Sequence, residues 1–205
     1  RKPIFQAAKK SPKRIVYAEG EDERVLRAAQ VVIDEGIAKP LLIGRPSEIA
    51  ERIEASGLRI REGVDYEVIY ADGCEFFDRH FDEFWQTYHR IMERKGVSPN
   101  YARREIGRRA TLYGALMVQL GYADGLICGT FGRHETHRQY VENVIGTQHG
   151  LDRYYTMNLL MLPGRTVFIA DTYVNYDPTA EKLADMTLLA AAENRNLGMY
   201  PKVAR

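Results

Sequence analysis

The sequence predicts an α/β fold with two lobes, in which a largely parallel sheet is flanked by helices and the second lobe is incomplete. Short β-branched or apolar runs alternate with amphipathic helical patterns along most of the 205 residues, and this order is typical of parallel sheets covered on both faces. Two apolar runs joined at Pro163-Gly164 break the alternation and predict a hairpin. We therefore expect a first α/β lobe over residues 1–146 and the start of a second lobe, with a hairpin and a helix, over residues 147–205.

Three short apolar runs predict the first strands, at residues 14–18, 40–44 and 66–70. Between the first two strands, apolar residues recur at helical spacing over residues 25–33, and Gly36 ends the pattern. Acidic residues 21–23 open this helix, where they complement the positive end of the helix dipole. A second helix is expected over residues 46–57, between a proline and a glycine.

A long helix rich in aromatic residues follows. Its large side chains recur at helical spacing until Gly96: Phe76, Phe77, His80, Phe81, Phe84, Trp85, Tyr88 and Ile91. Ser98 then has a favourable N-cap side chain, and Pro99 suits the first helical position. From there we expect one helix that ends at Gly121, because one face collects the apolar residues Ala102, Ile106, Ala110, Tyr113, Leu116, Met117 and Leu120.

The last third of the chain contains a strand, a hairpin and two helices. A buried strand is expected at residues 126–128, followed by a glycine-containing turn and a helix from about His134 to Ile145. The hairpin strands cover residues 157–162 and 166–170. We expect the last helix to start at Asp177-Pro178 and to close at Gly198 and Pro201, and a further strand to begin at residues 202–204.

Composition excludes several classes of protein. Hydrophobic residues make up 45% of the chain and charged residues 28%, values of a soluble globular domain. The 29 basic and 28 acidic side chains give a net charge of +1, so neither nucleic acid nor an anionic membrane surface is an expected partner. No apolar run is long enough to span a membrane. Cys74 and Cys128 are too few for a disulfide framework and fit a reducing cytoplasm. The first residue is Arg1, so we expect a piece of a longer protein.

The turn after the strand at residues 126–128 is the first candidate site. It reads Gly129-Thr130-Phe131-Gly132-Arg133-His134 and leads into a helix. Glycines allow close backbone approach, helix-start amides attract anions, and Arg133 and Arg138 could add charge to a phosphate site. An ordinary strand-to-helix turn with solvated arginines explains the same residues. Thr130, Arg133, His134 and Arg138 are therefore candidate ligand contacts.

A second candidate follows the strand at residues 166–170. Asp171 and Asn175 stand where a strand end should lead toward a helix start, and they could orient a ligand hydroxyl or amide. Asp and Asn most often cap turns, so a structural role explains them equally well.

Other patterns give weaker signals. His134 and His137 lie three residues apart without a third ligand nearby, which is not the spacing of a zinc site. The sequence contains no G-x-S-x-G, P-loop or G-x-G-x-x-G motif, so it gives no support to a nucleophilic enzyme or a dinucleotide site. A cluster of four arginines at positions 103, 104, 108 and 109 forms either a solvated helix face, or a phosphate contact or partner interface.

Four segments together resemble the phosphate acetyl/butyryl transferase family: residues 14–29, 114–118, 123–130 and 168–175. Within it, residues 127–132 and 171–175 are most similar to the C-terminal domain of the hybrid NADP-dependent malic enzymes of bacteria. The resemblance implies a two-lobed fold like that of the isocitrate and isopropylmalate dehydrogenases. The catalytic residues of true phosphotransacetylases would lie beyond Arg205, so none is assigned here. Gln139 also stands where the transferases have an arginine that binds coenzyme A.

The malic enzyme branch implies a regulatory and oligomerisation domain that binds acetyl-CoA as an effector. Malate oxidation to pyruvate, CO2 and NADPH, with its NADP and divalent metal sites, would belong to an N-terminal domain of the same chain. The resemblance also implies homo-oligomers formed through this domain. Two alternatives stay open: a truncated but active phosphotransacetylase, and an oligomerisation scaffold that has lost ligand binding.

Overall fold

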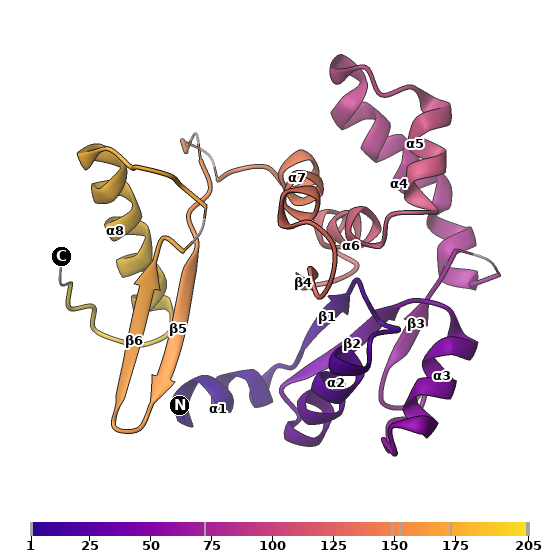
Figure 1. Ribbon diagram of the computed structural model, residues 1–205, viewed down its shortest axis with the longest axis horizontal. Helices are drawn as coiled ribbons and strands as arrows, with labels where there is room; N and C mark the ends of the chain where they lie inside the picture. The colour runs from indigo at the N-terminus through magenta and orange to yellow at the C-terminus, as the bar shows by residue number, and fades with distance from the viewer. Residues whose placement is uncertain (1, 72, 149, 152, 173, 204–205) are drawn as a thin grey trace. The chain divides into compact units, whose positions relative to one another are not determined.

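The computed structural model describes residues 2–71, 73–148, 150–151, 153–172 and 174–203. The chain divides into two compact units (Figure 1). We call Ala7–Gly146 the sheet unit, and Arg1–Gln6 with Thr147–Arg205 the hairpin unit. None of the helices in the described segments is both long and apolar enough to cross a membrane.

Four parallel strands form the centre of the sheet unit, in the order β3-β2-β1-β4. They are β1 (Lys13–Tyr17), β2 (Ala38–Ile43), β3 (Glu67–Ile69) and β4 (Gly125–Ile127). The chain adds β2 and β3 on one side of β1 and then places β4 on the other side. The order of the strands therefore reverses between β1 and β4, and ligands of open α/β sheets bind at such a point, beyond the carboxyl ends of the strands.

Helices cover both faces of this sheet, which confirms the predicted α/β class. They are α2 (Glu23–Glu35), α3 (Pro46–Ala55), α4 (Glu75–Met92), α5 (Pro99–Ile106), α6 (Ala110–Gln119) and α7 (His134–Val144), with a 3-10 turn η1 at Glu93–Lys95. Successive strand residues face opposite sides. Val16 packs in a cluster with α4, α5 and α6, whereas the next residue, Tyr17, packs with α2 and α3.

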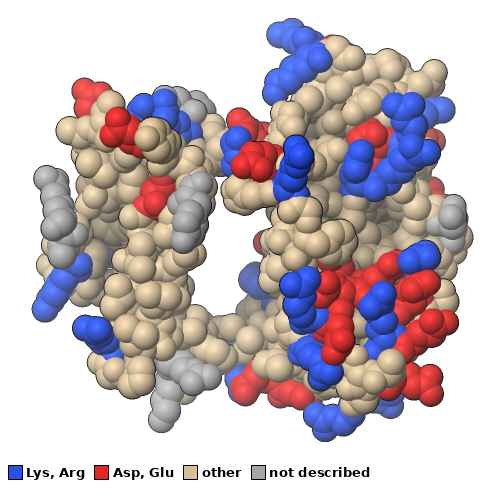
Figure 2. Space-filling model, viewed as in Figure 1, with Lys and Arg blue, Asp and Glu red and all other residues tan. Residues whose placement is uncertain are grey.

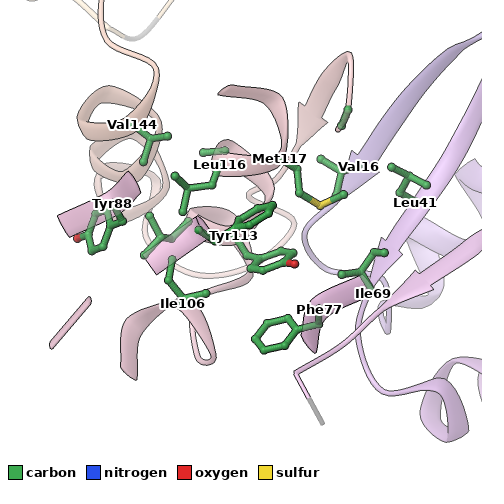
Figure 3. Close-up of a cluster of buried hydrophobic side chains, with 14 of the residues drawn as sticks. Val16, Leu41, Ile69, Phe77, Tyr88, Ile106, Tyr113, Leu116, Met117 and Val144 are labelled. Atoms are coloured by element: carbon green, nitrogen blue, oxygen red, sulfur yellow. The ribbon is translucent and has the colours of Figure 1, made fainter. Parts of the chain in front are cut away.

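The larger of the two clusters has aromatic rings at its centre (Figure 3). Phe84 on α4 is fully buried and stacks on Tyr113 of α6, with 4.6 Å between the ring centroids and 9° between the planes. Phe77 stacks on the same tyrosine at 5.1 Å. The aromatic side chains that recur at helical spacing in the sequence thus form the contact between α4 and α6.

The predicted signals at the ends of two helices are confirmed. Asp22 is the N-cap of α2 and accepts a hydrogen bond from the backbone N–H of Arg24 at 2.9 Å, and Gly36 ends α2 in the left-handed conformation with φ 63°. Ser98 caps α5 by accepting from the N–H of Tyr101 at 3.2 Å.

We expect Asp22→Ala to lower the free energy of unfolding by about 1 kcal/mol at pH 7, because an N-cap carboxylate is lost. Hydrogen bonds from Arg24 lower the pKa of Asp22 to about 2. A depressed pKa stabilises the fold above the unfolded value and loses this contribution as pH falls through the folded value. The difference between wild type and variant should therefore shrink between pH 4 and pH 2 in chemical denaturation.

Ser98→Ala is the matched control, because it removes an uncharged cap. Its cost should be similar at pH 7 and should not change over the same acid range. An Asp22→Ala difference that is equally large at pH 7 and pH 2 would contradict this assignment.

Two expectations for the sheet unit are wrong, and one helix at the start of the chain was missed. The helix expected to continue to Gly121 is broken into α5 and α6, because Arg109 adopts an extended conformation with φ −118° and ψ 91°. The strand β4 is not buried: Ile127 is 49% exposed, since β4 pairs only with β1 among the described strands. The helix α1 (Lys2–Lys10) was not predicted.

In the hairpin unit, β5 (Met157–Leu162) and β6 (Arg165–Ala170) pair antiparallel, as the sequence predicts. Helix α8 (Ala180–Asn196) starts later than expected, because Thr179 rather than Asp177 caps it by accepting from the N–H of Lys182. Lys202 and Val203 form no strand, and Ala204 lies outside the described residues.

Candidate functional site

A cavity of about 620 Å³ lies in the sheet unit beyond the carboxyl ends of β1, β2 and β3. Its size is within the range of small-molecule sites. The segments that follow these strands line it together with the turn between α5 and α6, through residues that include Glu19, Glu21, Arg45, Tyr70, Arg108 and Arg109. Ile43, Ile69, Phe77, Ile106 and Tyr113 supply apolar wall. The arrangement suits a ligand with an anionic part and a less polar part.

The turn after β4 is tied to the end of β1 across the strand-order reversal. The buried Glu19 carboxylate accepts a hydrogen bond from the N–H of Gly129 at 3.0 Å and one from the Thr130 hydroxyl at 3.4 Å. Phe131 of the same turn lines the cavity. Glu19 therefore fixes one wall of the site through backbone and hydroxyl donors.

His137 holds the same turn from α7. Its Nε2 lies 2.8 Å from the carbonyl oxygen of Phe131, and its Nδ1 lies 2.8 Å from the Thr111 hydroxyl. A carbonyl can only accept, so Nε2 carries a proton and donates it to Phe131. His137 thus serves as a structural link between α6, α7 and the turn.

The candidate contacts of this turn lie beside the cavity rather than in its wall. Thr130 is engaged with Glu19, and its carbonyl accepts from Arg24 at 3.2 Å. Arg133 and His134 are exposed at the start of α7. Arg138 forms an ion pair with Glu142 at 2.7 Å. Their contact with a ligand stays a prediction.

Asp171 and Asn175 hold the loop that follows β6 in the hairpin unit. One Asp171 oxygen accepts from the N–H and the hydroxyl of Thr156, both at 3.0 Å, and the other accepts from the N–H of Asn175 at 3.0 Å and from its side-chain amide at 2.6 Å. Burial opposes ionisation, but the hydrogen bonds from Asn175 and Thr156 outweigh it and lower the pKa of Asp171. The bonds from Asn175 stay within the loop and those from Thr156 tie it to the segment before β5, and a ligand role stays a prediction.

Most charges around the cavity already have partners. Glu21 accepts from Arg45 at 3.0 Å, which lowers the pKa of Glu21, and Asp22 pairs with Arg24 at 2.9 Å. In the segments that the structure describes, the side chain of Arg108 makes no ion pair, hydrogen bond or ring contact. The guanidinium of Arg108 is therefore available to a ligand anion.

The four clustered arginines fall into two pairs. Arg103 lies over the ring of Trp85 at 4.2 Å and Arg104 over that of Tyr101 at 5.2 Å, and neither lines the cavity. Arg108 and Arg109 do line it. The sequence identifies the arginine cluster but not which of its members line the cavity, because that depends on the break in the helix after Ile106. Gly107, a glycine inside a helical pattern, was the only sequence feature that could have indicated this break.

Possible metal ligands and thiols were compared with this site. The described part of the chain holds no group of three or more His, Cys, Asp or Glu side chains suited to a metal ion. Cys74 and Cys128 are free thiols. Burial raises the pKa of Cys128, which lowers its thiolate fraction at neutral pH.

Comparison with known proteins identifies the family. The family model described as Phosphate acetyl/butaryl transferase matches residues 1–205. The chain belongs to this family. An NADP-dependent malic enzyme from Escherichia coli is 47% identical over 203 residues, which are 99% of this chain and 26% of that protein. A phosphate acetyltransferase from Nitratidesulfovibrio vulgaris is 31% identical over 201 residues, 98% of this chain and 27% of that protein. The chain thus spans about a quarter of the length of these relatives.

Solved structures of two phosphotransacetylases share the fold. The EutD phosphotransacetylase from Staphylococcus aureus superposes with a TM-score of 0.82 at 20% identity, covering 98% of this chain and 58% of that one. A phosphotransacetylase from Streptococcus pyogenes gives 0.78 at 24% identity, covering 98% and 60%. The α/β architecture with a parallel sheet flanked by helices is therefore that of phosphotransacetylases.

Proposed function

We propose that this member of the phosphate acetyl/butaryl transferase family is a regulatory and oligomerisation domain of a cytoplasmic, NADP-dependent malic enzyme. It binds acetyl-CoA and is not itself catalytic. Malate oxidation to pyruvate and CO2, with its NADP and divalent metal, belongs to another domain of the same protein. Sequence comparison supports this assignment, because the chain shares 47% identical residues with the Escherichia coli malic enzyme and 31% with the Nitratidesulfovibrio phosphate acetyltransferase. In the same proposal, residues 147–205 begin a second lobe, as in isocitrate and isopropylmalate dehydrogenases.

The cavity beyond the strand ends is the observation that carries the ligand assignment. It combines an unpaired arginine, Arg108, with an apolar wall that includes Ile43, Ile69 and Phe77. Acetyl-CoA joins phosphate groups to a long uncharged arm, so it matches both parts of this lining. Regulation follows if acetyl-CoA binds one arrangement of the oligomer more tightly than another.

Calorimetric titration with acetyl-CoA tests the proposal. We expect saturable binding of acetyl-CoA to the protein and a rise in its melting temperature as the ligand approaches saturation. In the whole enzyme, acetyl-CoA should change the rate of malate-dependent NADP reduction. Absence of both heat and thermal shift at millimolar acetyl-CoA would refute the effector role.

A second candidate is phosphotransacetylase activity, which the family match and the acetyltransferase relatives favour. A coupled assay of acetyl-CoA formation from acetyl phosphate and coenzyme A distinguishes the two. We expect no turnover. Turnover that survives removal of any domain preceding this chain would favour the transferase, and a flat titration with an intact oligomer would favour a scaffold.

A further inference from the structure

The break between α5 and α6 directs two arginines toward the cavity. Residues 107–109 separate the helices, and Arg109 is the N-cap residue of α6 but gives it no side-chain hydrogen bond. Ala110, the first residue of α6, lines the cavity beside Arg108 and Arg109. The uncapped first turn of the ten-residue helix α6 therefore adds its positive end to the charge of two guanidinium groups.

Glu105 holds one of these arginines in place. Its carboxylate is 5% exposed and accepts hydrogen bonds from Arg109 Nε at 3.3 Å and from the Tyr140 hydroxyl at 3.2 Å. Arg109 binds Glu105 through Nε, and within the described segments its two terminal amino groups make no hydrogen bond, so they stay available. A guanidinium in this state can bind a phosphate with two parallel hydrogen bonds.

Tyr113 provides an independent sign of a ligand in the same cavity. It lies one turn further along α6, is 2% exposed and lines the cavity, yet its hydroxyl has no hydrogen-bond partner in the described chain. Figure 3 shows this oxygen at the end of the ring that points toward Ile69, a cavity-lining residue. Buried hydroxyls nearly always have partners, so this group calls for one that the described residues do not supply.

On the face seen in Figure 2, Lys and Arg side chains gather around α5, the helix that precedes the turn. Over α2 and α3, acidic and basic side chains alternate rather than gather by sign. Ion pairs such as Arg27 with Glu23 at 2.6 Å and Arg45 with Glu21 at 3.0 Å account for this pattern. An anion is therefore favoured at the turn between α5 and α6 over this paired surface.

We propose that the α5–α6 turn is a phosphate-binding subsite, in which Arg108, Arg109 and the first turn of α6 bind a phosphate group of the ligand and the Tyr113 hydroxyl bonds an uncharged polar group on the same ligand. Glu105 is the positioning residue for Arg109. The ligand class is a phosphate ester or pyrophosphate that carries an amide- or thioester-containing arm. That this ligand is acetyl-CoA rests on the proposed function, whereas the assignment of the phosphate subsite does not depend on it.

Arg108→Ala tests the subsite, with Arg104→Ala as the matched control. Both variants remove one exposed positive charge from the same short segment, but only Arg108 lines the cavity. We expect Arg108→Ala to weaken binding of acetyl-CoA and of pyrophosphate by about tenfold or more, because a charge-assisted hydrogen bond is lost. Arg104→Ala should stay within about twofold. Glu105→Gln should weaken the binding of both ligands, because Arg109 loses the carboxylate that positions it. Arg108→Ala should leave the melting temperature of the free protein unchanged.

Tyr113→Phe tests the second contact, with Tyr88→Phe as a buried control outside the cavity lining. The Tyr113 change removes a hydroxyl without a partner, so the melting temperature of the free protein should not fall. Affinity for acetyl-CoA should drop several-fold, as expected for one neutral hydrogen bond, and affinity for pyrophosphate should not change. Tyr88→Phe should alter neither affinity.

The outcomes separate the two proposals. If acetyl-CoA binds but Arg108→Ala behaves like Arg104→Ala, the subsite is wrong and the effector role stands. If acetyl-CoA does not bind but pyrophosphate does, and Arg108→Ala abolishes it, the effector role is wrong and the phosphate subsite stands. If neither ligand binds, both are wrong. Unchanged acetyl-CoA affinity in Tyr113→Phe would remove the hydroxyl from the proposal.

Discussion

Phe84→Ala is expected to lower the free energy of unfolding by about 3–5 kcal/mol, the cost typical of truncating a fully buried phenylalanine. Phe84 has no exposed surface, stacks on Tyr113 at 4.6 Å and lies 5.7 Å from the ring of Tyr122. Its removal leaves a hole between α4 and α6 that rigid neighbouring rings cannot fill. Urea denaturation of wild type and variant, followed by circular dichroism, measures the difference.

Phe81→Ala is the control, because Phe81 is on the same helix but only partly buried and contacts the ring of Phe77 at 5.5 Å. Its cost should be well below that of Phe84→Ala. Phe84→Leu should recover part of the loss, since leucine refills some of the hole. Equal costs for Phe81→Ala and Phe84→Ala would show that the centre of this cluster has been misplaced.

The elements that the sequence predicts correctly carry their signals locally. Asp22 and Gly36 mark the two ends of α2 within the chain segment that forms it, and the hairpin at Pro163-Gly164 joins strands that are adjacent in sequence. A cap, a left-handed glycine or a tight turn acts over a few residues, so these features can be recognised without knowledge of the fold.

The break after Ile106 could not be located in this way. The apolar residues on either side of it have helical spacing, and Arg109 departs from the helix while its side chain binds Glu105 and lies near Tyr140 of α7. This arrangement depends on a residue 35 positions away from Glu105. The spacing of apolar residues over a few helical turns carries no information about such a distant contact.

The candidate site shows the same limit. Arg104 and Arg108 cannot be told apart from the sequence. In the structure Arg104 lies over the ring of Tyr101, whereas Arg108 lines the cavity. The rule that ligands bind beyond strand ends pointed to the turn after β4, of which Phe131 lines the cavity, and also to the loop after β6 in the hairpin unit, whose described residues do not line it. Which side chains line the cavity depends on three segments that follow β1, β2 and β3, and the sequence does not show their register.

Gly20→Ala is expected to destabilise the sheet unit by about 2–4 kcal/mol, from overpacking and a strained backbone hydrogen bond. Gly20 follows β1, and its N–H donates to the carbonyl oxygen of Ile43 at 3.0 Å. A Cβ at this position would lie 2.8 Å from that oxygen and 2.9 Å from Cβ of Leu42. Both atoms belong to residues of β2, so relieving the clash requires the segment after β1 to move away from β2.

The same movement would displace Glu19, which precedes Gly20 and binds the N–H of Gly129. Gly20→Ala should therefore also weaken acetyl-CoA binding, through the wall formed by the turn after β4. Gly107→Ala is the matched control for stability only, because Gly107 itself lines the cavity: its φ is −75° and the nearest atom to the new Cβ, the Arg104 carbonyl oxygen, is 3.9 Å away. That variant should unfold at the same or slightly higher denaturant concentration, because alanine restricts the unfolded chain. If Gly20→Ala unfolded at the same concentration as Gly107→Ala, the close approach of β1 to β2 would not constrain this site.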